Sequence, residues 1–506
     1  MPPAEWQQQG SVKRPSLGRV GLIVGPVVFL FVVWAPSPQG LTDVAQFTAA
    51  VALLMAIWWI TEAIPIPATA LLPIVLFPLL GVGSAGAVAA NYAHHLIFLF
   101  LGGFWIAATL ERWNLHRRIA LHTIRIVGTS PHRVVLGFMV ATAFLSMWLS
   151  NTATTMMMLP IGMAVLSRIA PEALQRDAGE PLVNPFGTAL MLGIAYAASI
   201  GGVATLIGTP PNAVLAGVVE KLYGFKITFA DWIVFGLPLS VVMLVLAWWY
   251  LTRLSFTRLP RVRGTGKETI RNEIQRIGPL TFQEKAVLAV FVSVAAAWIG
   301  HGLAPWTWLA KLQDSSIAIA GAIALFLLPA KDGHGGRLLD WPTAVKIPWD
   351  IILLFGGGFA LADGFARSGL AEWIATQLAG LSGVGWVAIV AAVALLTIFL
   401  TEVTSNTATA TMLLPIVASI AAGAGIHPLG PMAAAALAAS FAFMLPVATP
   451  PNAVVFASRC VSIPQMARAG IWLNLLGFGM ITLFVTVVLP AIWGLDLSNL
   501  PEAWRK

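Results

Sequence analysis

Two copies of a short polar motif lie inside long apolar stretches of the sequence. Ser-Asn-Thr at 150–152 interrupts the apolar region 134–168, and Ser-Asn-Thr at 405–407 interrupts the region 387–422. Hydroxyl groups donate or accept hydrogen bonds, and the Asn side-chain amide does both. A helix that begins just after each motif would direct free N–H groups and its positive dipole end at one place, which suits an anion. The same motifs offer backbone and amide oxygens, which are hard ligands for a cation such as sodium.

A second repeated motif, Thr-Pro-Pro-Asn, occupies residues 209–212 and 449–452 within the apolar stretches 183–220 and 428–460. Proline removes a backbone N–H donor and clashes with the preceding turn, so two consecutive prolines break a helix and free carbonyl groups nearby. Irregular backbone at membrane depth is tolerated only where protein or a water-filled cavity satisfies it. The two polar motifs and the two helix breaks could therefore converge on one pocket.

These motifs are parts of an internal repeat. Ser-Asn-Thr and the Leu-Pro-Ile triplet at 159–161 both recur 255 residues later, and Thr-Pro-Pro-Asn recurs 240 residues later in the same order. A single 15-residue deletion reconciles the two offsets. Because an odd number of predicted crossings separates equivalent points, the second copy must be inverted. Inverted repeats with interrupted helices are typical of transporters, whose site lies at the repeat interface near the bilayer midplane.

The composition excludes a set of soluble domains. Of the 506 residues, 58% are hydrophobic and only 10% are charged, too few to cover soluble surfaces. A spanning helix needs about 20 mostly apolar residues, so we expect an all-α polytopic membrane protein with eleven transmembrane helices. The two interrupted regions, 134–168 and 387–422, are expected as re-entrant hairpins. The spans are expected near 20–36, 43–60, 66–82, 95–110, 183–220, 231–252, 285–303, 313–330, 350–366, 428–460 and 470–494.

Basic residues set the expected orientation. They concentrate in the connections 111–133 and 253–285, which are therefore expected in the cytoplasm, whereas 367–386 has only Arg367. The N-terminus would then be cytoplasmic and the C-terminus external. The net charge of +8 is explained by orientation in the bilayer, so no nucleic-acid partner is expected. The expected parts are a cytoplasmic tail at 1–19, the first helix and first repeat at 20–252, a cytoplasmic linker at 253–284 and the inverted second repeat at 285–495.

Three other features are weaker candidates for a function. Glu402 lies four residues before Asn406, and an intramembrane acid is functional by default, but a position in water at the hairpin mouth fits it equally well. His94 and His95 precede a predicted span, look interfacial and have no metal-binding companion set in the sequence. The Arg-rich amphipathic segment 111–127 is expected along the membrane surface.

No Arg or Lys lies in the four repeated motifs. A bound anion would have to be held by neutral donors, helix ends and a cation, and a multiply charged anion would gain most from that cation. This is a physical reason to expect coupling to sodium. Paired motifs offer two anion-binding faces, which favours a dicarboxylate over sulfate.

Other functional classes fit the sequence less well. An anion channel would share the polar pore and is an alternative to a transporter. The sequence has no HExxH motif, no Ser/His/Asp set at membrane depth and no Cys nucleophile with partners, so an enzyme is not expected.

With these motifs, the sequence resembles a known family. The stretch Ala-Ser-Phe-Ala-Phe-Met-Leu-Pro-Val-Ala-Thr-Pro-Pro-Asn-Ala-Val-Val at 439–455 fits the sodium/sulfate symporter signature. Over residues 40–495, the chain is similar to the divalent-anion/sodium symporters, the INDY-like dicarboxylate, citrate and sulfate carriers. The resemblance implies a homodimer in a bacterial inner (plasma) membrane, with scaffold and transport domains that interleave across both repeats. The transport domain would move as an elevator.

The resemblance also implies a substrate, a coupling ion and residues that bind them. The substrate would be a dicarboxylate of the succinate, malate, fumarate and 2-oxoglutarate class, carried with sodium; sodium-independent exchange and sulfate or citrate transport are alternatives. The substrate would contact Asn151, Thr152, Ser405, Asn406, Thr407, Thr209 and Pro450. One sodium ion would be held by Ser146, Ser150, Asn151, Gly201 and Gly202, and a second by Thr401, the Thr404 carbonyl, Asn406 and Ala448.

Overall fold

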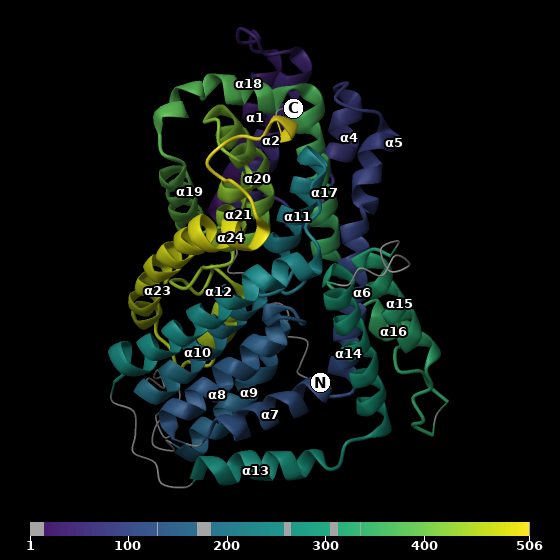
Figure 1. Ribbon diagram of the computed structural model, residues 1–506, viewed down its shortest axis with the longest axis vertical. Coiled ribbons are helices and arrows are strands. Elements are labelled where there is room, and N and C mark those ends of the chain that lie inside the picture. The colour runs from purple at the N-terminus through teal and green to yellow at the C-terminus, as the bar shows by residue number, and fades with distance from the viewer. Residues whose placement is uncertain are drawn as a thin grey trace.

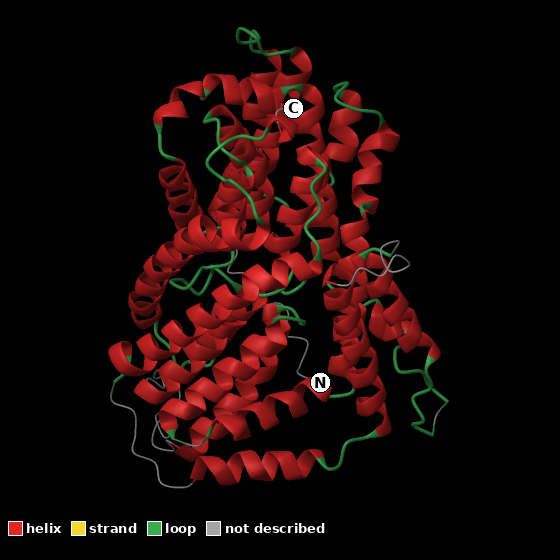
Figure 2. Ribbon diagram, viewed as in Figure 1, coloured by secondary structure: helices red, strands yellow, loops and turns green. Residues whose placement is uncertain are grey.

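The computed structural model describes residues 15–128, 130–169, 184–257, 265–303, 312–333 and 335–504. These residues form helices and connecting loops (Figure 2), and their one extended pairing is an isolated antiparallel bridge between Pro329 and Arg337. Ten helices in the described part are long and apolar enough to cross a membrane. The expected all-α polytopic fold class is confirmed. Most of the expected tail and the linker residues 258–264 lie outside the described residues.

The segments before the first hairpin follow most of the predicted spans. They are α1 (Pro15–Trp34), α2 (Asp43–Thr61), α3 (Ile66–Thr69), α4 (Leu72–Leu79), α5 (Ala85–Ala90), η2 (Asn91–Ala93), α6 (His95–Arg112) and α7 (Leu115–Val127). The predicted span 66–82 is instead two short helices. Pro67 and Pro73 lie in the first turns of α3 and α4, where a missing N–H is tolerated, so the prolines start two helices and prevent one continuous helix.

The first repeat contains a hairpin and a broken helix. Its elements are α8 (Pro131–Ser146), α9 (Asn151–Ile169), α10 (Pro185–Gly202), α11 (Pro210–Tyr223), α12 (Phe229–Trp249) and the π-helical turn η4 (Tyr250–Ser255). The hairpin helices α8 and α9 meet at the first Ser-Asn-Thr motif, and the prolines of the first Thr-Pro-Pro-Asn motif begin α11.

A further group of helices precedes the second hairpin, and all of it except α13 and the start of α14 lies within the expected second repeat, 285–495. It comprises α13 (Thr265–Ile277), α14 (Phe282–Leu303), α15 (Asp314–Leu327), α16 (Trp341–Ala344), α17 (Trp349–Ser368), α18 (Leu370–Gln377) and η6 (Ala379–Gly383). The expected linker thus contains a helix, α13. The predicted span 313–330 is shorter than expected, because Leu328 precedes a proline and is extended, which ends α15.

From its hairpin on, the second repeat has the elements of the first in the same order, followed by α24 and η8. They are α19 (Trp386–Thr401), α20 (Asn406–Gly423), α21 (Leu429–Ala439), α22 (Pro450–Ala457), α23 (Ile463–Leu483), the π-helical turn η7 (Phe484–Val488), α24 (Leu489–Trp493) and η8 (Glu502–Trp504). The hairpin helices α19 and α20 meet at the second Ser-Asn-Thr motif, and the second pair of prolines begins α22.

The two hairpins open toward opposite ends of the molecule (Figure 1). In the first hairpin α9 packs against α13, which lies at the lower end of that view, and in the second hairpin α20 packs against α18 at the upper end. The packing also crosses between repeats, since α9 contacts α22 and α20 contacts α11. The four motif-bearing elements are therefore joined in two pairs, each of which contains one element from each half of the chain.

The structural repeat continues beyond the motifs. Both α12 and α23 begin with a capping box, made by Thr228 with Asp231 and by Ser462 with Gln465, and both run into a π-helical turn. The capping residues are 234 positions apart, and so are the first residues of η4 and η7. The sequence motifs alone did not show this extension.

Two arginine–glutamate ion pairs join the amphipathic helix α7 to the residues of the expected linker, 253–284. Arg117 contacts Glu273 of α13 at 2.7 Å, and the buried Arg118 donates to both carboxylate oxygens of Glu284 in α14, at 2.7 and 3.0 Å. One face of the predicted surface helix is therefore buried against protein. These contacts hold the two basic connections together at one end of the molecule.

Candidate functional site

The tip of each hairpin is the turn where its Ser-Asn-Thr motif joins the two hairpin helices. At the first tip, between α8 and α9, the Ser146 hydroxyl lies among acceptor oxygens. Asn151 is the first residue of α9, and its Oδ1 is 2.6 Å from Ser146 Oγ, which is also 2.7 Å from the carbonyl oxygen of Ala198 in α10. A hydroxyl group has one proton, so Ser146 can donate to only one of these two oxygens at a time. The remaining close oxygen–oxygen contact favours a cation, because sodium binds to such carbonyl and amide oxygens at broken helices.

The second tip has the same arrangement. Thr401 Oγ1 lies 2.7 Å from Asn406 Oδ1 and 2.9 Å from the carbonyl oxygen of Ala439 in α21. Thr401 and Asn406 stand 255 residues after Ser146 and Asn151. Two independent halves of the chain thus build the same three-oxygen cluster from a hydroxyl, an amide and a carbonyl group.

Two glycines let α10 approach the first tip. A β-carbon at Gly202 would lie 2.6 Å from Asn151 Oδ1, and one at Gly201 would collide with the backbone of Ala143 in α8. Ser150 completes this end of the hairpin, where its hydroxyl accepts the Ala153 N–H at 3.2 Å and caps α9. The structure therefore brings together the side chains of Ser146 and Asn151 and the backbone of the two glycines.

The second expected cation set is brought together only in part. The Thr404 hydroxyl contacts Leu400 O at 2.8 Å and Thr409 Oγ1 at 2.6 Å, so its side chain is engaged inside the hairpin and only its carbonyl is left for a cation. Ala448 is buried in the break between α21 and α22. Within the described chain, no hydrogen bond joins Ala448 to Thr401.

The expected substrate residues differ in their surroundings. Four of them are half-buried: Asn151, Thr152, Ser405 and Asn406. Thr407 is buried, and Pro450 at the start of α22 is exposed. Thr209 is buried and its hydroxyl lies 3.3 Å from Ser440 Oγ, so this side chain joins the two helix breaks to each other.

The two hairpin helices begin differently. Ser150 caps the start of α9, but the Ser405 side chain accepts no capping hydrogen bond at the start of α20. The first N–H groups of α20 and the Ser405 hydroxyl are thus available together on a half-buried tip. A helix N-terminus with free N–H groups attracts an anion.

The asparagines of the Thr-Pro-Pro-Asn motifs stabilise the breaks. Asn212 Nδ2 donates to the carbonyls of Val203 (3.2 Å) and Thr205 (2.8 Å). Asn452 Nδ2 donates to two carbonyls of the second break, each at 3.0 Å. These side chains satisfy carbonyls that lose their helical partners where the helix breaks. Neither asparagine was expected to have a role of its own, although both stand at equivalent motif positions.

The Glu402 side chain stabilises the second helix break, between α21 and α22. Its carboxylate accepts the backbone N–H groups of Phe443 (2.8 Å), Met444 (2.9 Å) and Leu445 (3.1 Å) and the side-chain amide of Asn474 (2.7 Å). Only 3% of Glu402 is exposed, so the alternative of a position in water at the hairpin mouth is wrong. A buried carboxylate is stable only with several donors, and the unwound backbone supplies three of them.

The first break is stabilised without a charge. The residue equivalent to Glu402 is Met147, whose backbone carbonyl accepts the Thr205 hydroxyl at 2.6 Å. In both repeats the residue that follows the first hairpin helix is thus hydrogen-bonded to the helix break. The Thr205 hydroxyl makes this bond in the first repeat, and the Glu402 carboxylate makes it in the second.

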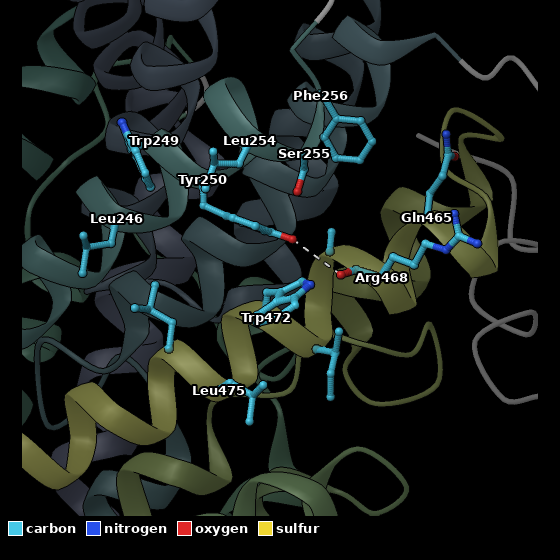
Figure 3. A pocket seen from close by; sticks show the side chains of 13 residues that line it. Leu246, Trp249, Tyr250, Leu254, Ser255, Phe256, Gln465, Arg468, Trp472 and Leu475 are labelled. Carbon is cyan, nitrogen blue, oxygen red and sulfur yellow. Dashed lines mark hydrogen bonds between the residues drawn. The ribbon is translucent and has the colours of Figure 1, made fainter.

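A cavity of about 1000 Å³ lies away from the tips (Figure 3). It is lined mainly by apolar side chains of α12, η4 and α23, and Tyr250 donates from its hydroxyl to the Arg468 carbonyl at 3.5 Å across it. Trp249 and Trp472 in its lining are exposed. None of the Ser-Asn-Thr or Thr-Pro-Pro-Asn residues lines this cavity, so it is not part of the candidate site.

Comparison with known proteins identifies the family. Residues 19–497 match the family described as "Sodium:sulfate symporter transmembrane region". The chain belongs to the sodium:sulfate symporter family. The match covers both hairpins and both broken helices, and it confirms the family resemblance found in the motifs.

Curated relatives of this sodium:sulfate symporter family member match it over nearly its whole length. The sodium-dependent dicarboxylate transporter SdcS of Staphylococcus saprophyticus is 44% identical over 483 residues, which cover 95% of this chain and 93% of SdcS. SdcS of Staphylococcus aureus (strain USA300) is 44% identical over 492 residues, covering 96% and 94%. These relatives are named as transporters, not as enzymes.

Two solved structures share the fold. Neisseria gonorrhoeae MtrF, described within a class of antimetabolite efflux pumps, has a TM-score of 0.55 at 12% identity and covers 91% of this chain and 97% of its own. The Alcanivorax borkumensis YdaH transporter has a TM-score of 0.53 at 13% identity and covers 95% and 97%. At such low identity the likeness concerns the fold alone.

Proposed function

We propose that the protein is a sodium-coupled symporter of dicarboxylate anions of the succinate, malate, fumarate and 2-oxoglutarate class. The printed names of the staphylococcal relatives support both the coupling ion and the substrate class. The observation that carries the proposal is the matched pair of three-oxygen clusters, one at each hairpin tip.

Each cluster would hold one sodium ion. At the first tip the ligands would be Ser146, Ser150 and Asn151 with the backbone of Gly201 and Gly202. At the second tip they would be Thr401, the Thr404 carbonyl, Asn406 and Ala448. Hydroxyl, amide and carbonyl oxygens are hard ligands that match sodium. Each cluster has three oxygen atoms but only one hydroxyl proton, which supports the assignment of a cation to it.

The dicarboxylate would bind between the two tips. Its carboxylates would face Asn151 and Thr152 on one side and Ser405, Asn406 and Thr407 on the other, with Thr209 and Pro450 in the walls. The uncapped start of α20 supports this assignment, because its N–H groups can donate to a carboxylate. Since no Lys or Arg stands in either tip motif, the two sodium ions would supply the positive charge.

The proposal also includes an elevator mechanism of transport and assembly as a homodimer. A transport domain containing both tips would slide against a scaffold domain in a bacterial plasma membrane. The end of the molecule with α7 and α13 would face the cytoplasm, and the end with α18 and the C-terminal segment would be external. The basic residues of the 111–133 and 253–285 connections support this orientation.

Uptake of labelled succinate into proteoliposomes tests the function. An inward sodium gradient would be present or absent, and internal succinate would be present or absent. We expect uptake that depends on the sodium gradient and needs no internal succinate. Uptake that does not depend on the sodium gradient but requires internal succinate would identify an exchanger. The two sodium sites would then be removed from the proposal.

Two further arms separate the remaining alternatives. Excess unlabelled sulfate or citrate should compete poorly with labelled succinate if the substrate is a dicarboxylate. Preloaded succinate should drive counterflow of external label in a transporter, whereas an anion channel shows none.

A further inference from the structure

A cluster of two histidines and a glutamate lies outside the candidate site. His94 precedes α6, His95 is its first residue, and Glu220 stands near the end of α11. His95 Nε2 is 2.7 Å from Glu220 Oε2, and His94 Nε2 is 3.8 Å from the same oxygen. The histidines were expected to lack a metal-binding companion, but the fold supplies one from 125 positions farther along the chain.

The geometry of the three side chains suits a transition-metal ion. One nitrogen or oxygen from each of them lies within 4.8 Å of the others. In a tetrahedral zinc site with bonds of about 2.1 Å, ligand atoms lie about 3.4 Å apart. The observed distances of 2.7 and 3.8 Å lie on either side of that value. Small rotations of the side chains would therefore complete a site of two histidines and one carboxylate, with a fourth position left for water.

Solvent can reach the cluster. The exposed fractions of the side chains are 16% for His94, 30% for His95 and 16% for Glu220. The His94 ring also packs against Phe359, with ring centroids 4.9 Å apart, which limits its movement. An ion from the surrounding solution could thus reach ligands that are already partly fixed.

Nearby charges oppose tight binding. Lys226 Nζ lies 3.8 Å from Glu220 Oε1, and its side chain is 60% exposed. Lys221 is paired with Asp363 at 3.3 Å, and Arg367 also contacts Asp363, at 2.9 Å. The exposed ammonium of Lys226 competes directly with a metal for Glu220, so removing it should strengthen metal binding.

We propose that His94, His95 and Glu220 form a binding site for a zinc-class metal ion that ties the start of α6 to the end of α11. The other end of α11 carries the Thr-Pro-Pro-Asn motif of the candidate site. A metal bond at Glu220 would therefore restrain a helix that reaches the site, and bound metal should slow transport. This last consequence rests on the proposed function, whereas metal binding itself does not.

The first experiment measures metal binding without transport. Tag-free purified protein would be titrated with Zn²⁺ by calorimetry and with Co²⁺ by visible absorption, which reports tetrahedral coordination. We expect one ion per chain. His95→Ala and Glu220→Gln should each weaken binding at least about tenfold, and Lys226→Gln should strengthen it.

Matched controls separate the site from general histidine binding. His132 is also half-buried but lies on α8, so His132→Ala should bind zinc as the unmodified protein does. His94→Ala gives a second removal of a ligand if Glu220→Gln does not fold, as judged by size-exclusion chromatography. Stoichiometric binding that survives both His94→Ala and His95→Ala would overturn the site, and so would an absence of stoichiometric binding to the unmodified protein.

The second experiment measures succinate uptake with and without Zn²⁺. Zinc should inhibit the unmodified protein and the His132→Ala variant, and a chelator should reverse the inhibition. The His95→Ala variant should transport without zinc and resist zinc. Binding without inhibition would overturn the restraint on α11, whereas an absence of uptake in metal-free buffer would instead count against the proposed function.

Discussion

The side-chain amide of Asn474 donates a 2.7 Å hydrogen bond to the buried carboxylate of Glu402. Asn474 lies within α23, and Glu402 ends α19. The same carboxylate holds three backbone N–H groups of the second helix break. A single side chain thus links the second hairpin, the second broken helix and the helix that follows it.

Removing the charge of Glu402 should loosen this break. In Glu402→Gln, one acceptor oxygen becomes an NH₂ group that faces other donors, so we expect a loss of about 2–3 kcal/mol in the free energy of unfolding. Thermal unfolding of the detergent-solubilised protein would measure it. Glu372 on α18 is exposed, and Glu372→Gln should leave the melting temperature unchanged. An equal melting temperature for both variants would show that the hydrogen bonds of Glu402 contribute little.

Removing either tip amide should abolish transport. Asn151→Ala and Asn406→Ala each delete the Oδ1 atom that lies next to the Ser146 or Thr401 hydroxyl. Succinate uptake should be lost, while expression and elution in size-exclusion chromatography stay as in the unmodified protein. Asn499 in the C-terminal segment is a matched control, and Asn499→Ala should transport normally. Normal uptake by either tip variant would remove that tip from the proposed site.

Adding one methyl group at Gly202 should weaken sodium binding. The new β-carbon of Gly202→Ala would lie 2.6 Å from Asn151 Oδ1 and would displace it. The sodium concentration for half-maximal uptake should rise about tenfold or more, as after other changes near ion ligands. Gly479 on α23 has open space where a β-carbon would stand, so Gly479→Ala should leave sodium dependence unchanged. Equal sodium dependence of the two variants would contradict the first cation site.

The proposed orientation predicts which single cysteines can be labelled from outside. The native Cys460 is buried and would be replaced by Ser to give a cysteine-free background. A membrane-impermeant thiol reagent should then label Ala503→Cys in intact cells but not Thr265→Cys. The reverse pattern would mean that the chain has the opposite orientation.

Acid should weaken the packing of the C-terminal segment. Burial lowers the pKa of His427 from 6.5 to about 4, and its ring lies 4.2 Å from that of Trp504. Because the folded-state pKa is below the unfolded value, His427 contributes stability above about pH 6.5 that is lost as the pH falls toward 4. Melting temperatures measured across this interval should fall less steeply in His427→Gln. Identical slopes for the two proteins would rule out His427 as the source.

The helix breaks could be located well from the sequence because their chemistry is local. Paired prolines and polar residues at membrane depth have few structural solutions, so the Ser-Asn-Thr and Thr-Pro-Pro-Asn motifs alone predict the tips and the breaks. The capping boxes at 228–231 and 462–465 also have a recognisable pattern, Thr/Ser followed three residues later by Asp/Gln. They could have been found, and they would have lengthened the repeat.

Contacts between distant positions had no such signal. Asn474 follows Glu402 by 72 residues and Glu220 follows His95 by 125 residues, and one sequence contains nothing that pairs them. For that reason Glu402 remained ambiguous and the histidines were expected to lack a metal-binding companion. Both conclusions depended on how helices pack, which local propensity does not determine.

The π-helical turns η4 and η7 change which side chains share one face of the helices that they follow, α12 and α23. A π turn is a rare local widening of a helix, and here it occurs at equivalent places in both halves. In a π turn the backbone hydrogen bonds run from residue i to residue i+5, so each turn adds one residue to the helical period. Side chains that follow η4 and η7 therefore lie one position away from the face that a continuous α-helix would give them. Both halves of the chain make this change at the equivalent place.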